Sequence, residues 1–211
     1  MARYVGRENV RKRLEPLEGG RGRTVYAGGA ARIEAPGERI TVRPPFGLAH
    51  EGAYQRVELG PLFAALAEDH LVAALLVRLG GYAAGVFEGE RLVASKVGTR
   101  FVKGKHKKGG SSSNRFRRRR EEQARALVEA AARTALGVLR PWEERVEHVA
   151  LGGDRRAVED VIAAEPRLGW LRERALPRFF AVPDPRLREL ERLPYDLYAA
   201  ELEAETTEGA G

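Results

Sequence analysis

The chain contains no cysteine and only one methionine among its 211 residues. The lack of cysteine excludes disulfide bonds, thiolate metal sites and a cysteine nucleophile. Long hydrophobic runs are missing too, since the longest, Leu71–Val77, is far shorter than the roughly 20 residues that cross a bilayer. The first seven residues lack the apolar stretch of a signal peptide. We therefore expect a soluble, cytoplasmic protein with no membrane contact.

Hydrophobic residues make up 43% of the chain, which is enough for a core and excludes wholesale disorder. At roughly 100–200 residues per domain, the length predicts one main domain with small additions. We expect an N-terminal helix with a small β extension over residues 1–60, the main domain over residues 61–200, and an acidic flexible tail over residues 201–211.

Positive charge is concentrated in one segment. Residues 96–120 hold 11 of the 37 Lys and Arg and no acidic residue, which leaves 26 basic residues against all 30 acidic ones elsewhere. An ordinary solvated surface mixes both signs, so the segregation favours a polyanionic partner, most simply RNA or DNA phosphate. The alternative is a basic loop with no specific partner.

The N-terminal third reads as a helix followed by short strands. Val10, Leu14 and Leu17 share one side of a helix over residues 7–17, and Gly19-Gly20 ends it. Gly and Pro turns then separate short predicted strands. The strands are expected at 24–26, 31–34 and 39–42, with a linker at 44–53 and a helix at 61–68.

The main domain begins with an apolar run, residues 71–79, that fits a buried helix or a central strand. We favour a strand, because Gly80-Gly81 leads into a second predicted strand as a hairpin turn would. The further expected elements are strands at 82–87 and 91–97, a basic loop at 98–114, a helix at 115–139, a strand at 147–151, a helix at 154–164 and a strand at 179–182. This order predicts an α/β (α+β) fold, a ribonuclease-H-like mixed sheet with an antiparallel meander, flanking helices and a protruding basic loop.

The basic loop combines features suited to phosphate. Gly109-Gly110 allows close backbone approach to a ligand. Ser111, Ser112, Ser113 and Asn114 are N-cap residues just before the predicted helix, whose free N–H groups favour anions. The candidate RNA-binding residues are Arg100, Lys103, Lys105, His106, Lys107, Lys108, Arg115, Arg117, Arg118, Arg119 and Arg120. The loop is not a Walker A motif, because Gly110 stands where the phosphate-binding lysine is needed.

Gly109-Gly110-Ser111-Ser112-Ser113-Asn114-Arg115-Phe116 and the following arginines resemble the catalytic loop of the actinobacterial-type branch of the Vms-like release factor family. These proteins are relatives of the middle domain of eukaryotic and archaeal peptide-chain release factors. The segments Leu75–Phe87 and Gly152-Gly153-Asp154, together with Arg100, are also similar to that branch. The resemblance covers roughly residues 71–193. It implies a monomeric, ribosome-associated factor, with large-subunit rRNA and peptidyl-tRNA as partners, that frees nascent chains from stalled ribosomes.

The resemblance also implies the site. The loop would enter the peptidyl-transferase centre, where it has only to position water or a ribose hydroxyl and stabilise developing charge. The candidate catalytic residues are Gly109, Gly110, Ser112, Ser113 and Asn114. No cofactor or metal is expected. The family pattern carries Gln where this chain has Ser113 and Asn114, so either Asn114 and a serine hydroxyl do the positioning or the protein binds without efficient hydrolysis.

Other functions fit this sequence less well. A metal nuclease needs carboxylates converging on the sheet, yet the predicted strands at 71–79 and 82–87 carry none and Asp154 fits a helix N-cap. The four histidines are scattered, without metal-ligand spacing. Trp142 and Trp170 are expected in the core or packed between helices. The open alternatives are a non-catalytic rRNA- or tRNA-binding module and a metal-free nuclease acting at the tRNA 3′ end. A second RNA contact on the helix at 7–17 is weaker than the interpretation of a solvated helix face.

Overall fold

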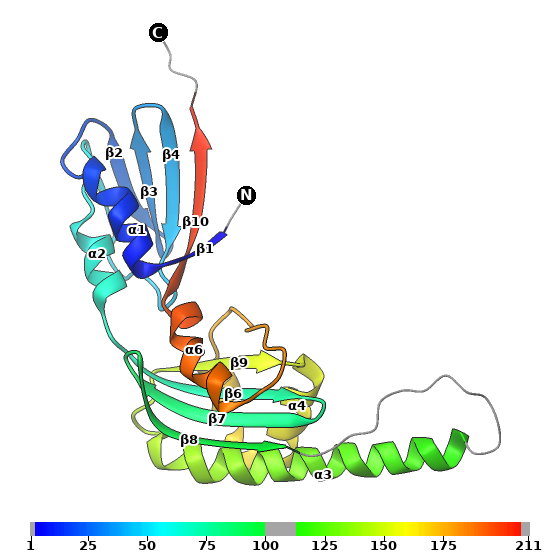
Figure 1. The fold of residues 1–211 in the computed structure, drawn as a ribbon. Helices are drawn as coiled ribbons and strands as arrows, with labels where there is room; N and C mark the ends of the chain where they lie inside the picture. The colour runs from blue at the N-terminus through cyan, green and yellow to red at the C-terminus, as the bar shows by residue number, and fades with distance from the viewer. Residues whose placement is uncertain (1–2, 100–112, 208–211) are drawn as a thin grey trace. The chain divides into compact units, whose positions relative to one another are not determined.

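The computed structural model describes residues 3–99 and 113–207, except for the side chains of residues 113–117. The chain divides into two compact units (Figure 1), one formed by Met1–Asp69 with Tyr195–Gly211 and the other by His70–Pro194. This division differs from the predicted boundaries at 60 and 200. Helix α2 (Gly60–Ala67) buries Leu62 and Leu66 in the core of the first unit, and the chain returns to that unit after Pro194.

The first unit is an antiparallel sheet with helices against it. Its strand order is β1-β10-β4-β3-β2-β5. The elements are β1 (Arg3–Gly6), α1 (Arg7–Leu14), a 3₁₀ turn (Glu15–Leu17), β2 (Arg23–Ala27), β3 (Ala30–Ala35), β4 (Glu38–Arg43), β5 (Gly52–Tyr54), α2 and β10 (Ala199–Thr206). Val10 and Leu14 of α1 are fully buried with Ile33 and Ile40 of the sheet, as the helical spacing of the first two predicts.

Strand β10 corrects the expectation of an acidic flexible tail from residue 201. It pairs with β1 on one side and β4 on the other. Ala200 and Leu202 face the core, whereas Glu201 and Glu203 lie on the other face, so apolar and acidic residues alternate with the period of a strand. The acidic composition concealed this alternation. Glu201 also pairs with Arg43 of β4 at 3.8 Å.

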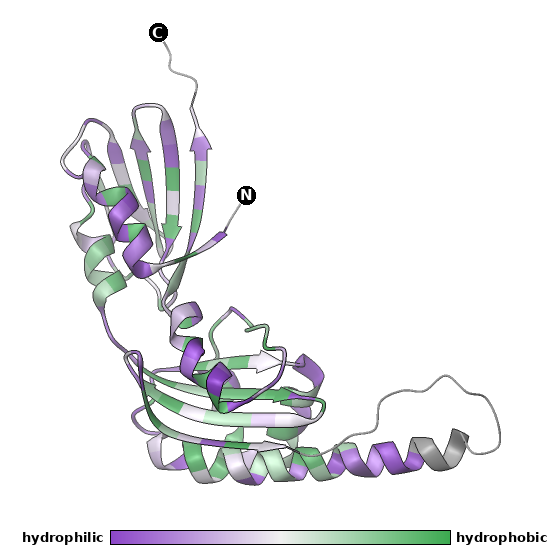
Figure 2. Ribbon diagram, in the orientation of Figure 1, coloured by the Kyte–Doolittle hydropathy of each residue, from purple (hydrophilic) through white to green (hydrophobic). Residues whose placement is uncertain are grey.

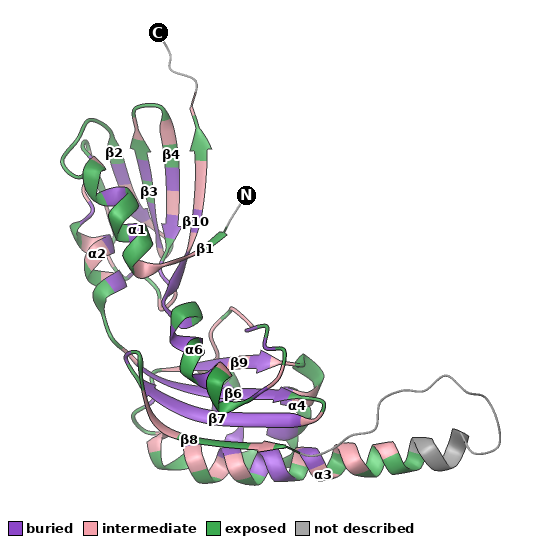
Figure 3. Cartoon of the chain, in the orientation of Figure 1, coloured by how far each residue is buried: buried purple, intermediate pink, exposed green. Residues whose placement is uncertain are grey.

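The second unit is built on a four-stranded mixed sheet in the order β8-β7-β6-β9. Its strands are β6 (Leu71–Arg78), β7 (Gly81–Glu88), β8 (Arg91–Thr99) and β9 (His148–Gly153). The first three form an antiparallel meander, and β9 lies parallel to β6. The predicted strand over the apolar run is confirmed. Residues 71–77 are all buried, because elements cover both faces of β6, and the run is therefore continuous rather than alternating (Figure 3).

The predicted ribonuclease-H-like order is confirmed for these strands, since β9 follows a helix and joins the meander beside its first strand. The predicted last strand at 179–182 is reduced. Phe180 makes an isolated parallel bridge to Gly152, and Ala175 makes another to Val149. Pro177 and Pro183 flank this segment and lack the N–H group that a ladder needs, so pairing beside β9 does not extend into a full strand.

Helix α3 (Ser113–Leu139) is the longest helix described, about 40 Å at 1.5 Å per residue. Its C-terminal half packs against the sheet and α4 (Arg155–Ala164), with Leu127, Ala131, Ala135 and Leu139 buried. Alanine at two of these positions, Ala131 and Ala135, lets the helix approach the strands closely. The N-terminal half continues past the sheet, and its described residues are hydrophilic (Figure 2).

Short elements connect the longer ones in this unit. A 3₁₀ turn (Arg140–Trp142) follows α3, and a second (Pro166–Leu168) and the short helix α5 (Trp170–Glu173) follow α4. Helix α6 (Leu187–Leu197) then leads the chain back to the first unit. Trp170 is buried and Trp142 packs against the same cluster, which confirms their predicted place in the core. In the part of the chain that the structure describes, no helix combines the length and apolarity needed to cross a membrane.

Candidate nucleic-acid interface

Most of the candidate site lies outside the described residues. This holds for the candidate catalytic residues Gly109, Gly110 and Ser112 and for the basic residues Arg100, Lys103, Lys105, His106, Lys107 and Lys108. The backbone of Ser113, Asn114, Arg115 and Arg117 forms the start of α3. The side chains of Arg118, Arg119 and Arg120 are described, and the first two are exposed.

The described flanks fix where the basic segment joins the fold. It follows Thr99 at the end of β8 and precedes Ser113 at the start of α3. Thr99 pairs with Gly81, and Gly81 pairs with Arg78 at the end of β6. The segment therefore leaves the sheet at the edge where β6 ends.

The same edge holds the Gly152-Gly153-Asp154 turn. Leu76 pairs with Gly152 and Val77 with Gly153, because β9 is parallel to β6. Parallel strands bring their carboxyl ends to one edge of the sheet, which is where open α/β sheets bind ligands. The structure thus brings together three features that resembled one family in sequence: the Leu79-Gly80 turn between β6 and β7, the turn at Gly152-Gly153-Asp154 and the root of the basic segment.

Close packing explains the glycines of this turn. A Cβ on Gly152 would lie 2.7 Å from the Phe180 carbonyl oxygen and 2.8 Å from a methyl group of Leu76. Gly153 has a φ of 96°, and a Cβ there would lie 2.1 Å from the Val77 carbonyl oxygen. Both positions therefore require glycine for the contact between backbones.

Asp154 caps helix α4, as predicted. Its Oδ1 accepts a hydrogen bond from the Ala157 backbone N–H at 3.0 Å, and its own N–H donates to the Val77 carbonyl at 2.7 Å. A carboxylate held at a helix N-terminus in this way satisfies a free donor and favours the positive end of the helix. Its structural role accounts for the residue without a metal.

At the root of the segment, Gly98 lies under the ring of Tyr82. A Cβ on Gly98 would come within 2.3 Å of the Tyr82 ring carbon and hydroxyl oxygen. Tyr82 is buried in the core of the second unit. The sequence marked Tyr82 only as the start of a strand, and the glycine opposite it in β8 was the one signal that could have identified the contact.

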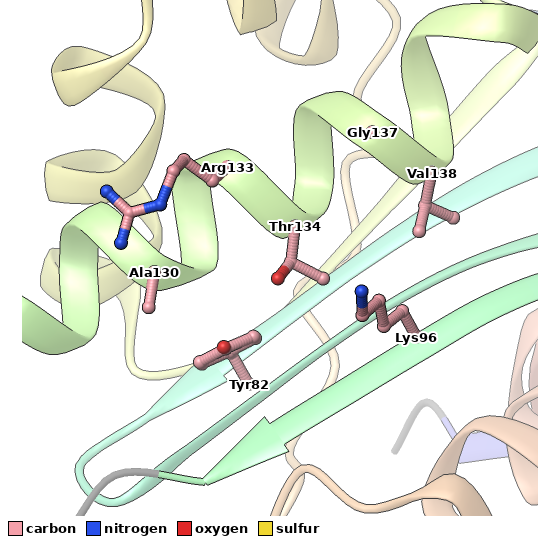
Figure 4. Close-up of a pocket in the computed structure, with 7 residues that line it drawn as sticks. All are labelled: Tyr82, Lys96, Ala130, Arg133, Thr134, Gly137 and Val138. Carbon is pink, nitrogen blue, oxygen red and sulfur yellow. The ribbon is translucent and has the colours of Figure 1, made fainter.

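Next to Tyr82 lies a cavity of about 510 Å³ between β7, β8 and α3 (Figure 4). Lys96 of β8 extends toward α3 near Thr134 and Val138. Arg133 also lines the cavity but lies on the outer side of the helix, where it pairs with Glu129 at 4.0 Å. Lys96 belongs to the basic segment by composition, and the structure places it at the described base of that segment.

Three of the four basic residues of α1 face carboxylates. Arg7 pairs with Asp69 and Arg13 with Glu38, both at 3.1 Å, and Arg11 approaches Glu15 at 3.9 Å. These exposed pairs balance the charge of the helix locally. They support the interpretation of a solvated helix face over that of a second RNA contact.

Metal-ligating groups gather at the other end of the sheet. Among the described residues, the group with three potential ligands is His70, Glu147 and His148. The prediction that the histidines are scattered is wrong for this pair, because the parallel pairing of β6 and β9 brings together residues that are far apart in sequence.

Glu147 is held in its charged form at this end. Burial raises the pKa of Glu147, but the hydrogen bond from the Leu71 N–H and the contacts with His70 and His148 outweigh it, so the pKa lies below its usual range. Its Oε1 accepts from the Leu71 N–H at 2.9 Å and its Oε2 lies 2.8 Å from His70 Nδ1.

One family model and two solved structures match parts of this chain. Residues 70–203 match the family model described as the Actinobacteria/chloroflexi VLRF1 release factor. The crystal structure of an archaeal translation termination factor, aRF1, is similar with 15% identity and a TM-score of 0.43, over 90% of this chain and 54% of that one. A structure described as an archaeal protein has 15% identity and a TM-score of 0.33, over 76% of this chain and 50% of that one. The chain thus spans about half the length of both. No curated protein matches it.

Proposed function

Because the chain belongs to the Actinobacteria/chloroflexi VLRF1 release factor family, we propose that it acts on stalled ribosomes and cleaves the nascent chain from peptidyl-tRNA. The matched region contains the whole second unit, including the strand and the helix that flank the basic segment. Family membership supports a ribosome-associated, release-factor-like role. The reaction and the residues that carry it out are the proposal.

One observation carries the proposal furthest. The Gly109-Gly110 segment, with its surplus of cations, is inserted between the edge strand β8 and the long helix α3, at the carboxyl edge of the sheet. The exposed Arg118 and Arg119 continue the positive charge onto α3. Such an arrangement suits a partner made of phosphates, and Gly109-Gly110 suits a crowded cavity because glycine lets the backbone approach closely.

Hydrolysis of the peptidyl-tRNA ester requires an attacking oxygen in position and stabilisation of the charge that develops. Water attacks the ester carbonyl carbon, and the 3′ ribose oxygen leaves with a proton, so the products are a free peptide acid and intact tRNA. The backbone N–H groups of Gly109 and Gly110 would stabilise the developing oxyanion. The Asn114 amide, helped by the hydroxyls of Ser112 and Ser113, would orient the attacking oxygen. The basic residues would hold the segment on large-subunit rRNA.

Peptide release tests this proposal. Purified protein is mixed with 50S subunits carrying radiolabelled peptidyl-tRNA, and free peptide is measured over time. We expect release by the wild type and a loss of at least tenfold in a Gly109→Ala, Gly110→Ala variant, with little change in RNA affinity. Gly137→Ala is the matched control, because a Cβ there meets no atom within 4 Å. Its release rate should equal that of the wild type.

The same assay separates the alternatives. Asn114 and Ser113 replace the Gln of the family pattern, which favours a non-catalytic binding module as the second candidate. That candidate predicts RNA binding with no release above background. Mass analysis of the tRNA 3′ end distinguishes ester hydrolysis, which leaves CCA intact, from nuclease cleavage, which removes it.

A further inference from the structure

The starts of β6 and β9 bring two histidines and a glutamate into one cluster. Val72 pairs with His148, so His70 and Leu71 lie beside Glu147. The rings of His70 and His148 have centroids 5.0 Å apart and meet nearly edge to face at 76°. The chain has only four histidines, and two of them meet here. This concentration of nitrogen donors around one carboxylate is the feature to explain.

The geometry of the donors fits a transition metal. One ligand atom from each of His70, Glu147 and His148 lies within 4.8 Å of the other two. In a tetrahedral zinc site with bonds of about 2.1 Å, ligand atoms lie about 3.4 Å apart. His70 Nδ1 and Glu147 Oε2 are already closer, at 2.8 Å. The proposed site requires side-chain rotations that bring the three donors from these separations to about 3.4 Å.

We propose that His70, Glu147 and His148 bind a Zn²⁺ ion, with water as the fourth ligand. Imidazole nitrogens and a carboxylate are borderline and hard donors that suit zinc over Ca²⁺ or Mg²⁺, which take oxygen ligands. The set has three protein ligands and one open position. It lies at the edge of the sheet opposite the root of the basic segment and is independent of the proposed release reaction.

The backbone prepares Glu147 for this role. The Glu147 N–H donates to the Leu71 carbonyl at 2.9 Å, and the Leu71 N–H donates to Glu147 Oε1 at 2.9 Å. These two bonds hold one carboxylate oxygen in place and leave the other directed at His70. A bound ion would take the position between Oε2 and the two rings while the bonds to Leu71 remain. The ion would connect the residue before β6 to the start of β9 and so stabilise the pairing of these two strands.

Metal binding to untagged protein tests the proposal. The protein is stripped with a chelator, dialysed and titrated with ZnCl₂ by calorimetry, and with CoCl₂ by visible absorption. We expect one Zn²⁺ per chain, and for cobalt the intense absorption bands of a four-coordinate ion. His148→Gln and His70→Gln should each weaken zinc binding at least tenfold. Zinc should raise the melting temperature of the wild type and leave that of these variants unchanged.

His50→Gln is the matched control, because His50 lies in the first unit and bonds the Tyr54 hydroxyl at 2.9 Å. It should bind zinc as the wild type does. Glu147→Gln tests the carboxylate, and circular dichroism checks that the variant is folded. A wild type that binds no zinc, or variants His148→Gln and His70→Gln that bind as tightly as His50→Gln, would overturn the site. These measurements need no ribosome, so their outcome is separate from that of the release assay.

Discussion

The ring of Tyr82 occupies the space that a side chain at Gly98 would need, with ring atoms 2.3 Å from the position of a Cβ. The two residues face each other across β7 and β8, one residue before the end of β8. This contact positions the end of strand β8 just before the basic segment begins. It connects that end of the strand to the core of the second unit, in which Tyr82 is buried.

Gly98→Ala should therefore destabilise the second unit. Overpacking of this kind costs about 1–3 kcal/mol in the free energy of unfolding. Urea denaturation measures it, with Gly137→Ala as control. The control should be neutral or more stable by up to about 1 kcal/mol, because alanine favours a helix and meets no neighbour there. In a Tyr82→Ala background, Gly98→Ala should cost much less. Equal costs in both backgrounds would show that the ring does not set the requirement for glycine.

Variants of Asp154 distinguish a role in helix capping from a role in the release reaction. Asp154→Ala removes the acceptor for the Ala157 N–H and should cost about 1 kcal/mol. Asp154→Asn keeps an oxygen at the cap and should retain most of the stability and the full rate of peptide release. The two melting temperatures and the two release rates check this. A collapse of release in the Asn variant alone would assign Asp154 to the chemistry.

Arg118 and Arg119 should contribute to RNA affinity through charge. A double variant, Arg118→Gln and Arg119→Gln, should weaken binding to rRNA and flatten its dependence on salt. Each lost phosphate contact lowers the slope of log K against log salt by about 0.7–0.9. Fluorescence anisotropy at several salt concentrations measures both quantities. Arg172→Gln is the control, because Arg172 is engaged with Glu159 at 2.7 Å. An unchanged slope in the double variant would remove Arg118 and Arg119 from the interface.

The first unit should lose stability in alkali. Burial raises the pKa of Tyr26 to about 12 in the folded state, above its ordinary value of 10. The folded state thus binds this proton more tightly, so its contribution is complete below pH 10 and is lost as pH rises toward 12. The free energy of unfolding of the wild type should therefore fall between pH 10 and pH 12.

Tyr26→Phe isolates that effect. It removes the hydroxyl that donates to the Glu58 carbonyl at 2.7 Å and should cost about 1–2 kcal/mol at neutral pH. Its stability should then vary less between pH 10 and pH 12 than that of the wild type. Tyr195→Phe, at a residue that is 73% exposed, should follow the wild type. Parallel pH profiles for the Tyr26 variant and the wild type would contradict the assignment.

Local pattern predicted much of the second unit. The apolar run at 71–77 and the stripe along α3 depend on neighbours in sequence, and both were found where predicted. The predicted hairpin turn is also present but lies one residue earlier, at Leu79-Gly80, because Gly81 pairs with Arg78 as the first residue of β7. The same local logic failed for β10. There the period-two signal was short and its polar half was glutamate, so composition suggested a solvated tail, and only the neighbouring strands β1 and β4 reveal the alternation.

Residue types and near spacing were enough to predict the segregation of charge, the strand-and-helix order of the second unit and the resemblance to a release factor family. Long-range packing was needed to show that His70 meets His148 and that Gly152-Gly153 lies at the same edge as the root of the basic segment. Both follow from the parallel pairing of β6 with β9. That pairing joins strands separated by two further strands and a long helix, and its register is set by packing between distant residues rather than by any local pattern.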